Sequence, residues 1–449
     1  MLLRLAAALL LALVLLPARA ASTTIELWHA MDGAHGEYLG EIVKRFNASQ
    51  NEYQVVPVYK GSYDETVAAA TAAHLQGKGP VIVQVYDVAT MNMMAAKNLM
   101  KPASQVLAEA GEKIPADAFA PVVASYYSDA KGNLAAIPFN TSTPVLFYNK
   151  DAFAKAGITA PAFKTWYDVQ EALLKLYEAG ATRCGITTTW PAWILIENTL
   201  AWHNEEFATR NNGFDGSNAQ LDFNTRLAIR HLSLMTTWVK SRLFTYSGRR
   251  EEGEAAFTRG DCAMLTASSA VYGDLVRNAS FRFGVMPMPY YDDLSPTPHH
   301  TAMGGAALWT MAGRKPAEYK GAAKFLAFVS RPETQAFWHQ NTGYLPLSAA
   351  AWQMTNKTGY YEKYPGTDVA IQQMIGKGGP PGPYSRGVRL GNYAQIRAII
   401  DEEIEDTFAL KKPPKLALDE AVRRGNDVLT RFAQGNAAAA PAAKPAKKK

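Results

Sequence analysis

Residues 24 to about 311 alternate between segments with the apolar pattern of strands and segments with that of helices. The first predicted strands are residues 24–28, 53–59 and 81–85. The helix between the first two shows the i, i+3, i+4, i+7 apolar face of Leu39, Ile42, Val43 and Phe46. Pro57 argues against a central position for the second strand. This alternation predicts an open α/β sheet, which binds ligands beyond the carboxyl ends of its strands.

An extended segment at residues 137–149 holds polar residues between two apolar stretches, so we expect a strand that leaves a first domain and enters a second. The expected second-domain helices and strands are residues 166–176, 227–239, 262–268 and 283–288. After Gly304 and Gly305, residues 306–311 predict another apolar strand. The C-terminal third is helical, and the Ala/Pro/Lys tail at 435–449 predicts disorder.

The first twenty residues have the pattern of a secretory signal peptide. Arg4 precedes an unbroken apolar run at residues 5–16, and Ala18-Arg19-Ala20 has the small-x-small pattern of a cleavage site. No Cys follows the run, so we expect no lipid anchor. We therefore predict a mature protein that begins near Ala21 and works in the periplasm.

The formal net charge of +6 is misleading for the folded part. Six basic residues lie in the leader or the tail, namely Arg4, Arg19, Lys444, Lys447, Lys448 and Lys449. Without them the charge is 6 − 6 = 0, so we expect no nucleic-acid partner and no membrane-surface role. Cys184 and Cys262 are the only cysteines, and the sequence leaves open whether they form a disulfide.

Motifs for nucleotide binding and for common hydrolases are absent. There is no G-x-x-x-x-G-K-[ST], G-x-G-x-x-G at a strand-helix junction, G-x-S-x-G or H-E-x-x-H. His299 and His300 are adjacent, so on an extended segment they point in opposite directions, and we expect a solvated loop there. We expect no metal, no cofactor and no enzymatic activity.

Longer strings carry a family resemblance, and they follow one another from residue 25 to the last helix. They include IELWHAMDG, VPVYKGSYDETV, PFNTSTPVLFYNKDAFAKAG, GDCAMLTASSA, GGAALWTM and RLGNYAQIRAIIDEE. The chain resembles the periplasmic glycerol-3-phosphate-binding proteins of ATP-binding-cassette (ABC) importers, within the sugar-type extracellular solute-binding family. The resemblance implies a maltose-binding-protein-like fold of two α/β lobes joined by a hinge.

The lobes implied by the resemblance are residues 21–141 with 305–345, and residues 142–304 with 346–434. The resemblance further implies that the ligand lies between the lobes and that a membrane permease accepts the loaded protein, which we expect to be a monomer. We expect the ligand to be glycerol 3-phosphate, and we expect glycerophosphodiesters such as glycerophosphocholine to bind as well.

The resemblance also implies ligand-binding residues, and most of them match the family strings. These are Tyr63, Ser142, Ser268, Gly305, Tyr344, Arg397 and Trp166. Asp87 stands where the family usually has glutamate, and a carboxylate acceptor is retained. We expect Ser142, Ser268, the Gly305 amide, Tyr344 and Arg397 to bind the phosphate, with Trp166 nearby. Tyr63 and Asp87 suit the glycerol hydroxyls.

Other interpretations remain open at this point. Arg397 could form a surface ion pair with Glu402 or Glu403, and Trp190 and Trp193 could be core or cleft-wall residues. An oligosaccharide receptor of the same fold is the main functional alternative, and a cleft lined by Trp28, Trp190 and Trp193 would favour it. A periplasmic phosphodiesterase is a weaker alternative, because it would need a metal cluster or an activated nucleophile.

Overall fold

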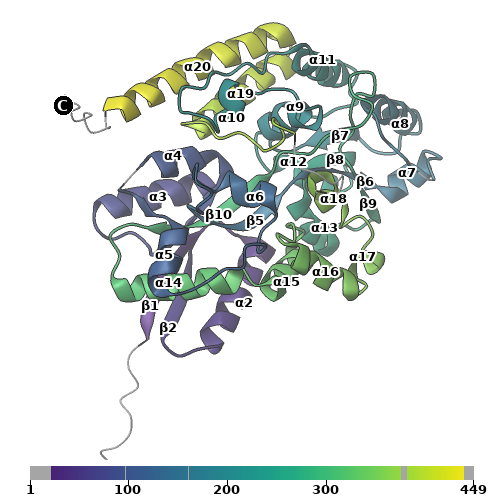
Figure 1. The fold of residues 1–449 in the computed structure, drawn as a ribbon. Coiled ribbons are helices and arrows are strands. Elements are labelled where there is room, and N and C mark those ends of the chain that lie inside the picture. Colours follow the sequence, from purple (N-terminus) through teal and green to yellow (C-terminus); the bar gives the residue numbers. More distant parts are fainter. Residues whose placement is uncertain (1–21, 97, 160, 376–381, 439–449) are drawn as a thin grey trace, which may run out of the picture.

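The computed structural model describes residues 22–438 apart from residues 97, 160 and 376–381. Within this range the chain forms two β-sheets, each flanked by helices (Figure 1). The predicted α/β class is confirmed by this arrangement. The predicted signal peptide at residues 1–20 lies outside the described residues, and the proposed lobe boundaries stay a prediction.

Six strands form the first sheet, in the order β2-β1-β3-β10-β4 with β5 also paired to β10. They are β1 (Thr23–His29), β2 (Tyr53–Tyr59), β3 (Ile82–Tyr86), β4 (Met100–Lys101), β5 (Ile137–Ser142) and β10 (Gly304–Met311). β1 is parallel to β2 and β3, whereas β10 is antiparallel to β3, β4 and β5. β2 lies at the sheet edge, where the missing backbone N–H of Pro57 is tolerated because one side of the strand has no partner strand.

Several strand ends meet at one side of the first sheet. The parallel strands β1 and β3 end there, at His29 and Tyr86. β10 begins on the same side, because its register pairs Ala306 with Tyr86 and Gly304 with Ser142 at the end of β5. This side is therefore where a ligand of an open α/β sheet is expected.

Four strands form the second sheet, in the order β7-β8-β6-β9. They are β6 (Pro144–Asn149), β7 (Cys184–Thr188), β8 (Cys262–Ser268) and β9 (Phe283–Met286). Only Thr143 separates β5 from β6, so the segment predicted at 137–149 does pass from one sheet to the other. Pro144 pairs with Ser268, which brings the end of β8 close to the end of β5.

Helices pack on both sheets. Those that contact the first sheet or each other around it are α2 (Gly33–Ala48), α3 (Tyr63–Leu75), α5 (Ala103–Ala110) and α14 (Pro316–Val329). The predicted apolar face of α2 is buried. α3 begins with a capping box in which the Ser62 hydroxyl accepts from the Glu65 N–H and the Glu65 carboxylate accepts from the Ser62 N–H. This cap fixes the start of α3 and thereby the place of Tyr63.

The second sheet is contacted by α7 (Lys150–Lys155), α8 (Trp166–Glu178), α12 (Glu252–Thr258) and α18 (Val369–Ile375). The predicted helix at 227–239 is α11 (Arg226–Lys240). The shorter remaining helices are η1 (Asp87–Ala89), α4 (Thr90–Ala95), α6 (Pro121–Tyr126), α10 (Thr209–Asn212), η3 (Ser269–Val271), α13 (Tyr272–Asn278), α15 (Pro332–Thr342), α16 (Ala349–Lys357) and α17 (Tyr360–Lys363).

A π-helical turn, η2 (Ala192–Glu197), leads into α9 (Asn198–Trp202) and contacts α19 (Tyr393–Phe408). All six residues of η2 are buried. α20 (Pro414–Ala438) packs on α19. Because α20 continues to Ala438, the prediction of disorder from residue 435 is wrong for residues 435–438, where alanine favours helix. Residues 439–449 lie outside the described residues.

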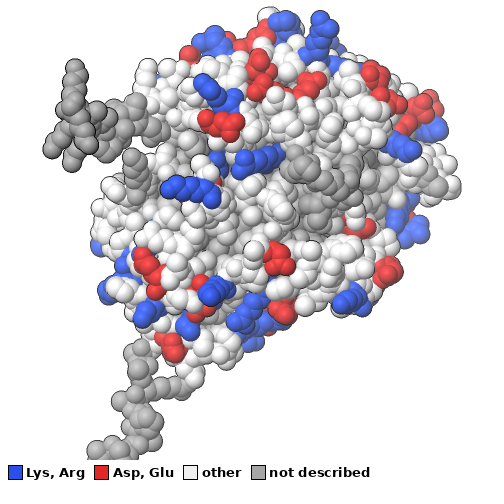
Figure 2. Space-filling view, viewed as in Figure 1, with Lys and Arg blue, Asp and Glu red and all other residues white. Residues whose placement is uncertain are grey.

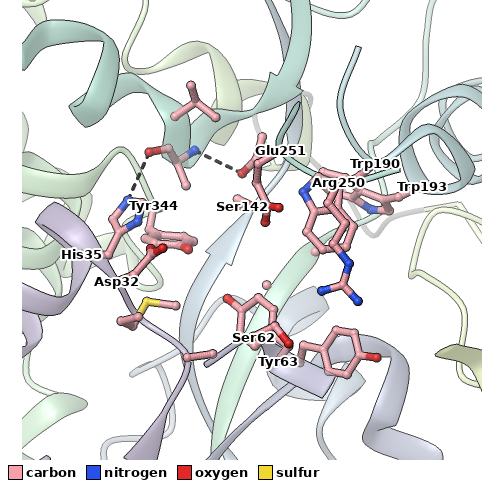
Figure 3. Close-up of a pocket in the computed structure, with 18 of the residues that line it drawn as sticks. Asp32, His35, Ser62, Tyr63, Ser142, Trp190, Trp193, Arg250, Glu251 and Tyr344 are labelled. Carbon is pink, nitrogen blue, oxygen red and sulfur yellow. Dashed lines mark hydrogen bonds between the residues drawn. The ribbon is translucent and has the colours of Figure 1, made fainter. Parts of the chain in front are cut away.

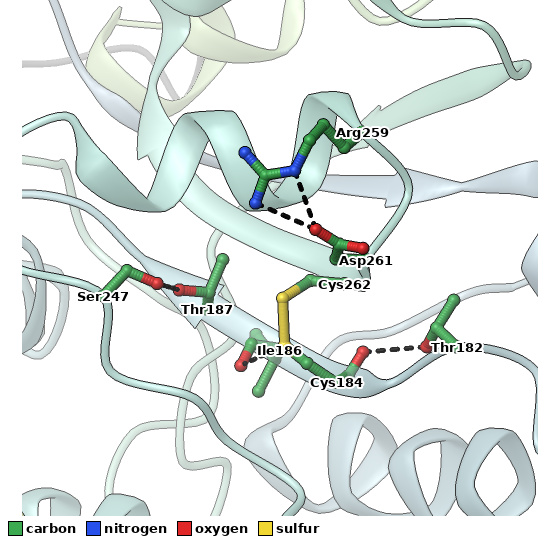
Figure 4. The surroundings of a disulfide bond; sticks show 8 residues. All are labelled: Thr182, Cys184, Ile186, Thr187, Ser247, Arg259, Asp261 and Cys262. Carbon is green, nitrogen blue, oxygen red and sulfur yellow. Dashed lines mark hydrogen bonds and ion pairs between the residues drawn. A yellow bond between two sulfur atoms is a disulfide. The ribbon is translucent and has the colours of Figure 1, made fainter.

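Cys184 and Cys262 form a disulfide, which answers the question that the sequence left open (Figure 4). They are directly paired at the start of the parallel strands β7 and β8, with their Cα atoms 4.4 Å apart. Both residues are buried. Ser268 lies at the other end of β8, roughly 20 Å away at the usual rise of a strand.

Charged residues of both signs are interspersed over the face seen in Figure 2. No helix of the described residues is long and apolar enough to cross a membrane.

His300 is buried, so the prediction of a solvated loop at His299 and His300 is wrong for His300. The reason is that this segment packs on α9, where the His299 N–H donates to the Trp202 carbonyl oxygen at 2.8 Å.

Candidate functional site

A cavity of about 430 Å³ lies where the ends of the two sheets approach each other (Figure 3). Its wall includes end residues of β3, β5, β8 and β10. Seven of the eight predicted site residues line it, namely Tyr63, Asp87, Ser142, Ser268, Gly305, Tyr344 and Arg397. Among these predicted residues, Tyr63 and Arg397 are the farthest apart in the sequence, and both lie in one wall.

Trp166 is the predicted site residue that does not line the cavity. It is the first residue of α8, after the Thr165 cap, and is 1% exposed. Its ring packs against His231 and Trp238, with ring centroids 4.8 and 6.2 Å away. α8 thus directs Trp166 into the core against α11, and we leave this residue out of the proposed site.

Arg397 lies between two buried carboxylates. Its Nε donates to Glu197 Oε1 at 2.6 Å, and its Nη2 donates to Glu197 Oε2 at 2.8 Å and to Asp87 Oδ2 at 3.0 Å. The Glu197 side chain is 3% exposed and that of Asp87 6%. The alternative of a surface pair with Glu402 or Glu403 is wrong, because Arg397 pairs with Glu197 and Asp87, whereas Glu402 and Glu403 pair with Arg424.

Burial dominates the electrostatics of this cluster. Burial is the largest of the effects that raise the pKa of Asp87 to about 6. The charge of Arg397 lowers this pKa, and the charge of Glu197 raises it. Burial also opposes the charge of Arg397, but Glu197 and Asp87 outweigh this effect and hold its pKa well above the ordinary value. The guanidinium therefore remains charged and its charge is fully matched by protein groups.

Tyr63 and Tyr86 form a second part of the wall. Their rings stack with centroids 5.3 Å apart, and the Tyr86 hydroxyl donates to Asp64. Arg250, from the loop before α12, forms an ion pair with the same Asp64 and also lines the cavity. The sequence did not indicate Arg250, because its partner lies 186 residues away.

Gly305 occupies a position that excludes other residues. Its φ is +109°, and a Cβ built there would lie 1.9 Å from the carbonyl oxygen of Asn140. The approach of β10 to β5 is therefore too close for a side chain.

Ser268 ends β8, and its hydroxyl accepts from the Ala270 N–H at 3.2 Å.

A model of the bacterial extracellular solute-binding protein family matches residues 41–366 of the chain. The sn-glycerol-3-phosphate-binding periplasmic protein UgpB of Yersinia enterocolitica is 48% identical over 418 residues, covering 93% of this chain and 94% of that protein. The UgpB of Escherichia coli O1:K1 is 46% identical over 429 residues, covering 95% of this chain and 97% of that protein. The chain belongs to the extracellular solute-binding protein family.

Solved structures of solute-binding proteins support the fold. UgpB from Mycobacterium tuberculosis, in complex with glycerophosphocholine, superposes with a TM-score of 0.75 at 21% identity, covering 91% of this chain and 99% of that chain. Maltose-bound MalE3 of T. maritima superposes with a TM-score of 0.70 at 15% identity, covering 90% of this chain and 99% of that chain. The predicted maltose-binding-protein-like fold is confirmed.

Two tryptophans that the sequence left open as core or cleft-wall residues lie in the wall of this solute-binding protein. Trp190 and Trp193 both line the cavity. The Trp193 indole N–H has no hydrogen-bond partner among the described residues, and its ring lies against Gly304. Trp190, Trp193 and Glu197 follow an i, i+3, i+7 spacing, a signal that could have placed them on one face. Trp28 is not part of the cavity wall.

We predict that Gly305→Ala lowers ligand affinity more than tenfold and the free energy of unfolding by about 2 kcal/mol, because a Cβ needs both a positive φ and space that Asn140 occupies. Gly313→Ala is the matched control, since Gly313 also has a positive φ, but no atom of the described residues beyond its chain neighbours lies within 4 Å of the place that a Cβ would take. Calorimetric titration and chemical denaturation measure the two effects. Equal affinities in both variants would contradict the prediction.

Proposed function

We propose that this protein captures sn-glycerol 3-phosphate in the periplasm, also accepts glycerophosphodiesters, and delivers them as a monomer to the permease of an ABC importer. The curated relatives that bear the name UgpB match nearly the whole chain at 46–48% identity. The observation that carries the proposal is the convergence of the seven predicted residues on one cavity. We propose that the protein itself catalyses no reaction.

The surroundings of Arg397 support a change in the expected roles. A phosphate dianion placed beside Asp87 and Glu197 would face two carboxylates whose charge exceeds that of the one guanidinium. We therefore assign Asp87 and Arg397 to the glycerol hydroxyls, which need both an acceptor and a donor. Arg397 was predicted to be the cation that binds the phosphate, and we now propose that it binds the glycerol hydroxyls.

The phosphate is then assigned to Ser142, Ser268, the Gly305 amide and Tyr344. Ser142 pairs with Gly304, and Ser268 lies at the adjoining strand end, so these donors come from both sheets. Micromolar affinity needs about 8 kcal/mol, and each hydrogen bond to a charged group contributes about 1.5–3 kcal/mol. Four such donors contribute about 6–12 kcal/mol, a range that includes the required value. Trp190 and Trp193 supply apolar wall against the carbon chain.

Calorimetric titration of the mature protein with glycerol 3-phosphate, glycerophosphocholine and maltose tests the proposal. We expect micromolar binding of glycerol 3-phosphate, weaker binding of glycerophosphocholine and none of maltose. Tight binding of maltose alone would establish the oligosaccharide receptor, which the two wall tryptophans favour. Release of choline during the glycerophosphocholine titration, detected by mass spectrometry, would establish a phosphodiesterase.

A further inference from the structure

A chain of hydrogen bonds leads from the main chain of the first sheet to the cavity. The Ala30 N–H donates to Gln84 Oε1 at 2.9 Å, and Gln84 Nε2 donates to Asn140 Oδ1 at 2.8 Å. Asn140 Nδ2 then donates to the Tyr63 hydroxyl oxygen at 2.8 Å. Gln84 on β3 and Asn140 on β5 are both 0% exposed. Neither amide lines the cavity, and Asn140 reaches it through the hydroxyls of Tyr63 and Tyr344, which do.

The Ala30 N–H sets the direction of every hydrogen bond in this series. A backbone N–H can only donate, so the oxygen of the Gln84 amide must face Ala30 and its NH₂ must face Asn140. For the same reason the oxygen of the Asn140 amide faces Gln84, and its NH₂ faces Tyr63. The usual ambiguity between amide oxygen and nitrogen is thereby removed.

The Tyr63 hydroxyl is left with one available role. Its oxygen accepts from Asn140, and its proton is therefore directed elsewhere. Burial, helped by Tyr344 and Asp87 and opposed by Asn140, holds the pKa of Tyr63 well above the ordinary value, so the proton is retained. The Tyr344 hydroxyl lies in the same wall and interacts with Tyr63.

We propose that Gln84 and Asn140 are positioning residues that make Tyr63 a fixed hydrogen-bond donor to an acceptor oxygen of the ligand, either directly or through the Tyr344 hydroxyl. This inference rests on the proposed function of the cavity. A donor whose direction is set before binding needs no reorganisation when an oxygen-rich, anionic ligand enters. It also disfavours a ligand group that can only donate.

A double-mutant cycle on the affinity for glycerol 3-phosphate tests the inference. In Asn140→Asp the side chain keeps its shape and still accepts from Gln84, but its carboxylate accepts the Tyr63 proton and turns it away from the ligand. We expect Asn140→Asp and Tyr63→Phe each to weaken binding about tenfold to hundredfold. Because Asn140 also contacts Tyr344, the double variant should bind more weakly than Tyr63→Phe by less than the full Asn140→Asp factor.

A purely structural or charge effect of Asn140→Asp would persist when Tyr63 is absent. The inference is therefore overturned if the double variant loses the full Asn140→Asp factor on top of the Tyr63→Phe factor. Asn92→Asp, which changes an amide outside the cavity wall that pairs with Asn392, is the matched control and should leave affinity unchanged.

If Asn140→Asp does not fold, Gln84→Glu replaces it in the same cycle. Glutamate still accepts from Ala30 but cannot donate to Asn140, so the chain is reversed one step earlier. Binding of glycerol 3-phosphate by the unaltered protein separates the two failures. Without that binding both the proposed function and this inference fail, whereas normal binding with an additive cycle overturns this inference alone.

Discussion

Replacement of Arg397 by alanine is expected to abolish ligand binding and to lower the free energy of unfolding by about 3–5 kcal/mol. The substitution leaves Glu197 and Asp87 buried side by side without the guanidinium that contacts both. It also removes the donor assigned to the glycerol hydroxyls. Chemical denaturation measures the stability, and calorimetric titration with glycerol 3-phosphate measures the affinity.

The loss of stability should depend on pH. Burial raises the pKa of Asp87 to about 6, so the folded protein holds more protons than the unfolded chain between its ordinary value and pH 6. The protonated Asp87 carboxyl stabilises the folded protein at low pH, and this stabilisation is lost as the pH rises from the ordinary pKa of aspartate to about 6. Without Arg397 the pKa rises further, and the gap between variant and unaltered protein should be smaller at about pH 5 than at about pH 8.

Arg230→Ala is the control for this prediction. Arg230 forms an ion pair with Asp293, but the Asp293 side chain is 55% exposed and the pair lies outside the cavity wall. We expect a loss below about 1 kcal/mol and unchanged affinity. If Arg397→Ala behaved like Arg230→Ala, the assignment of Arg397 to the site and to the buried cluster would both be refuted.

The strands that surround the cavity were predictable from local pattern. The apolar run at 81–85 and the string Cys262–Ser268 match β3 and β8 closely. The break between β5 and β6 was signalled by polar residues in an otherwise apolar segment. These features are readable because the burial of a strand acts on consecutive residues of the sequence.

Contacts between distant segments could not be predicted in the same way. Glu197 and Arg397 are 200 residues apart, and nothing near either one specifies the other. Gln84 and Asn140 carry ordinary amides on apolar strands, and only the arrangement of β3 and β5 on either side of β10 brings them together. Trp166 shows the reverse case, since a matching string placed it in the site although its helix turns it into the core.

Loss of the disulfide is expected to lower the free energy of unfolding by about 4 kcal/mol, because the bridge closes a loop of 78 residues in the unfolded chain. Ligand affinity of the folded protein should not change. The bridge joins the first residues of β7 and β8, whereas the cavity is reached at the last residue of β8.

Cys184→Ala/Cys262→Ala, compared with the oxidised protein by chemical denaturation, measures this effect directly. We expect β7 and β8 to stay paired without the bridge, since their register continues past it through Ile186 and Thr188. The effect should therefore arise in the unfolded chain, and reductant should reduce stability only of the unaltered protein. An equal response of the double variant to reductant would show that the effect does not come from the bridge. A change in the affinity of the double variant for glycerol 3-phosphate would show that the bridge acts on the folded site.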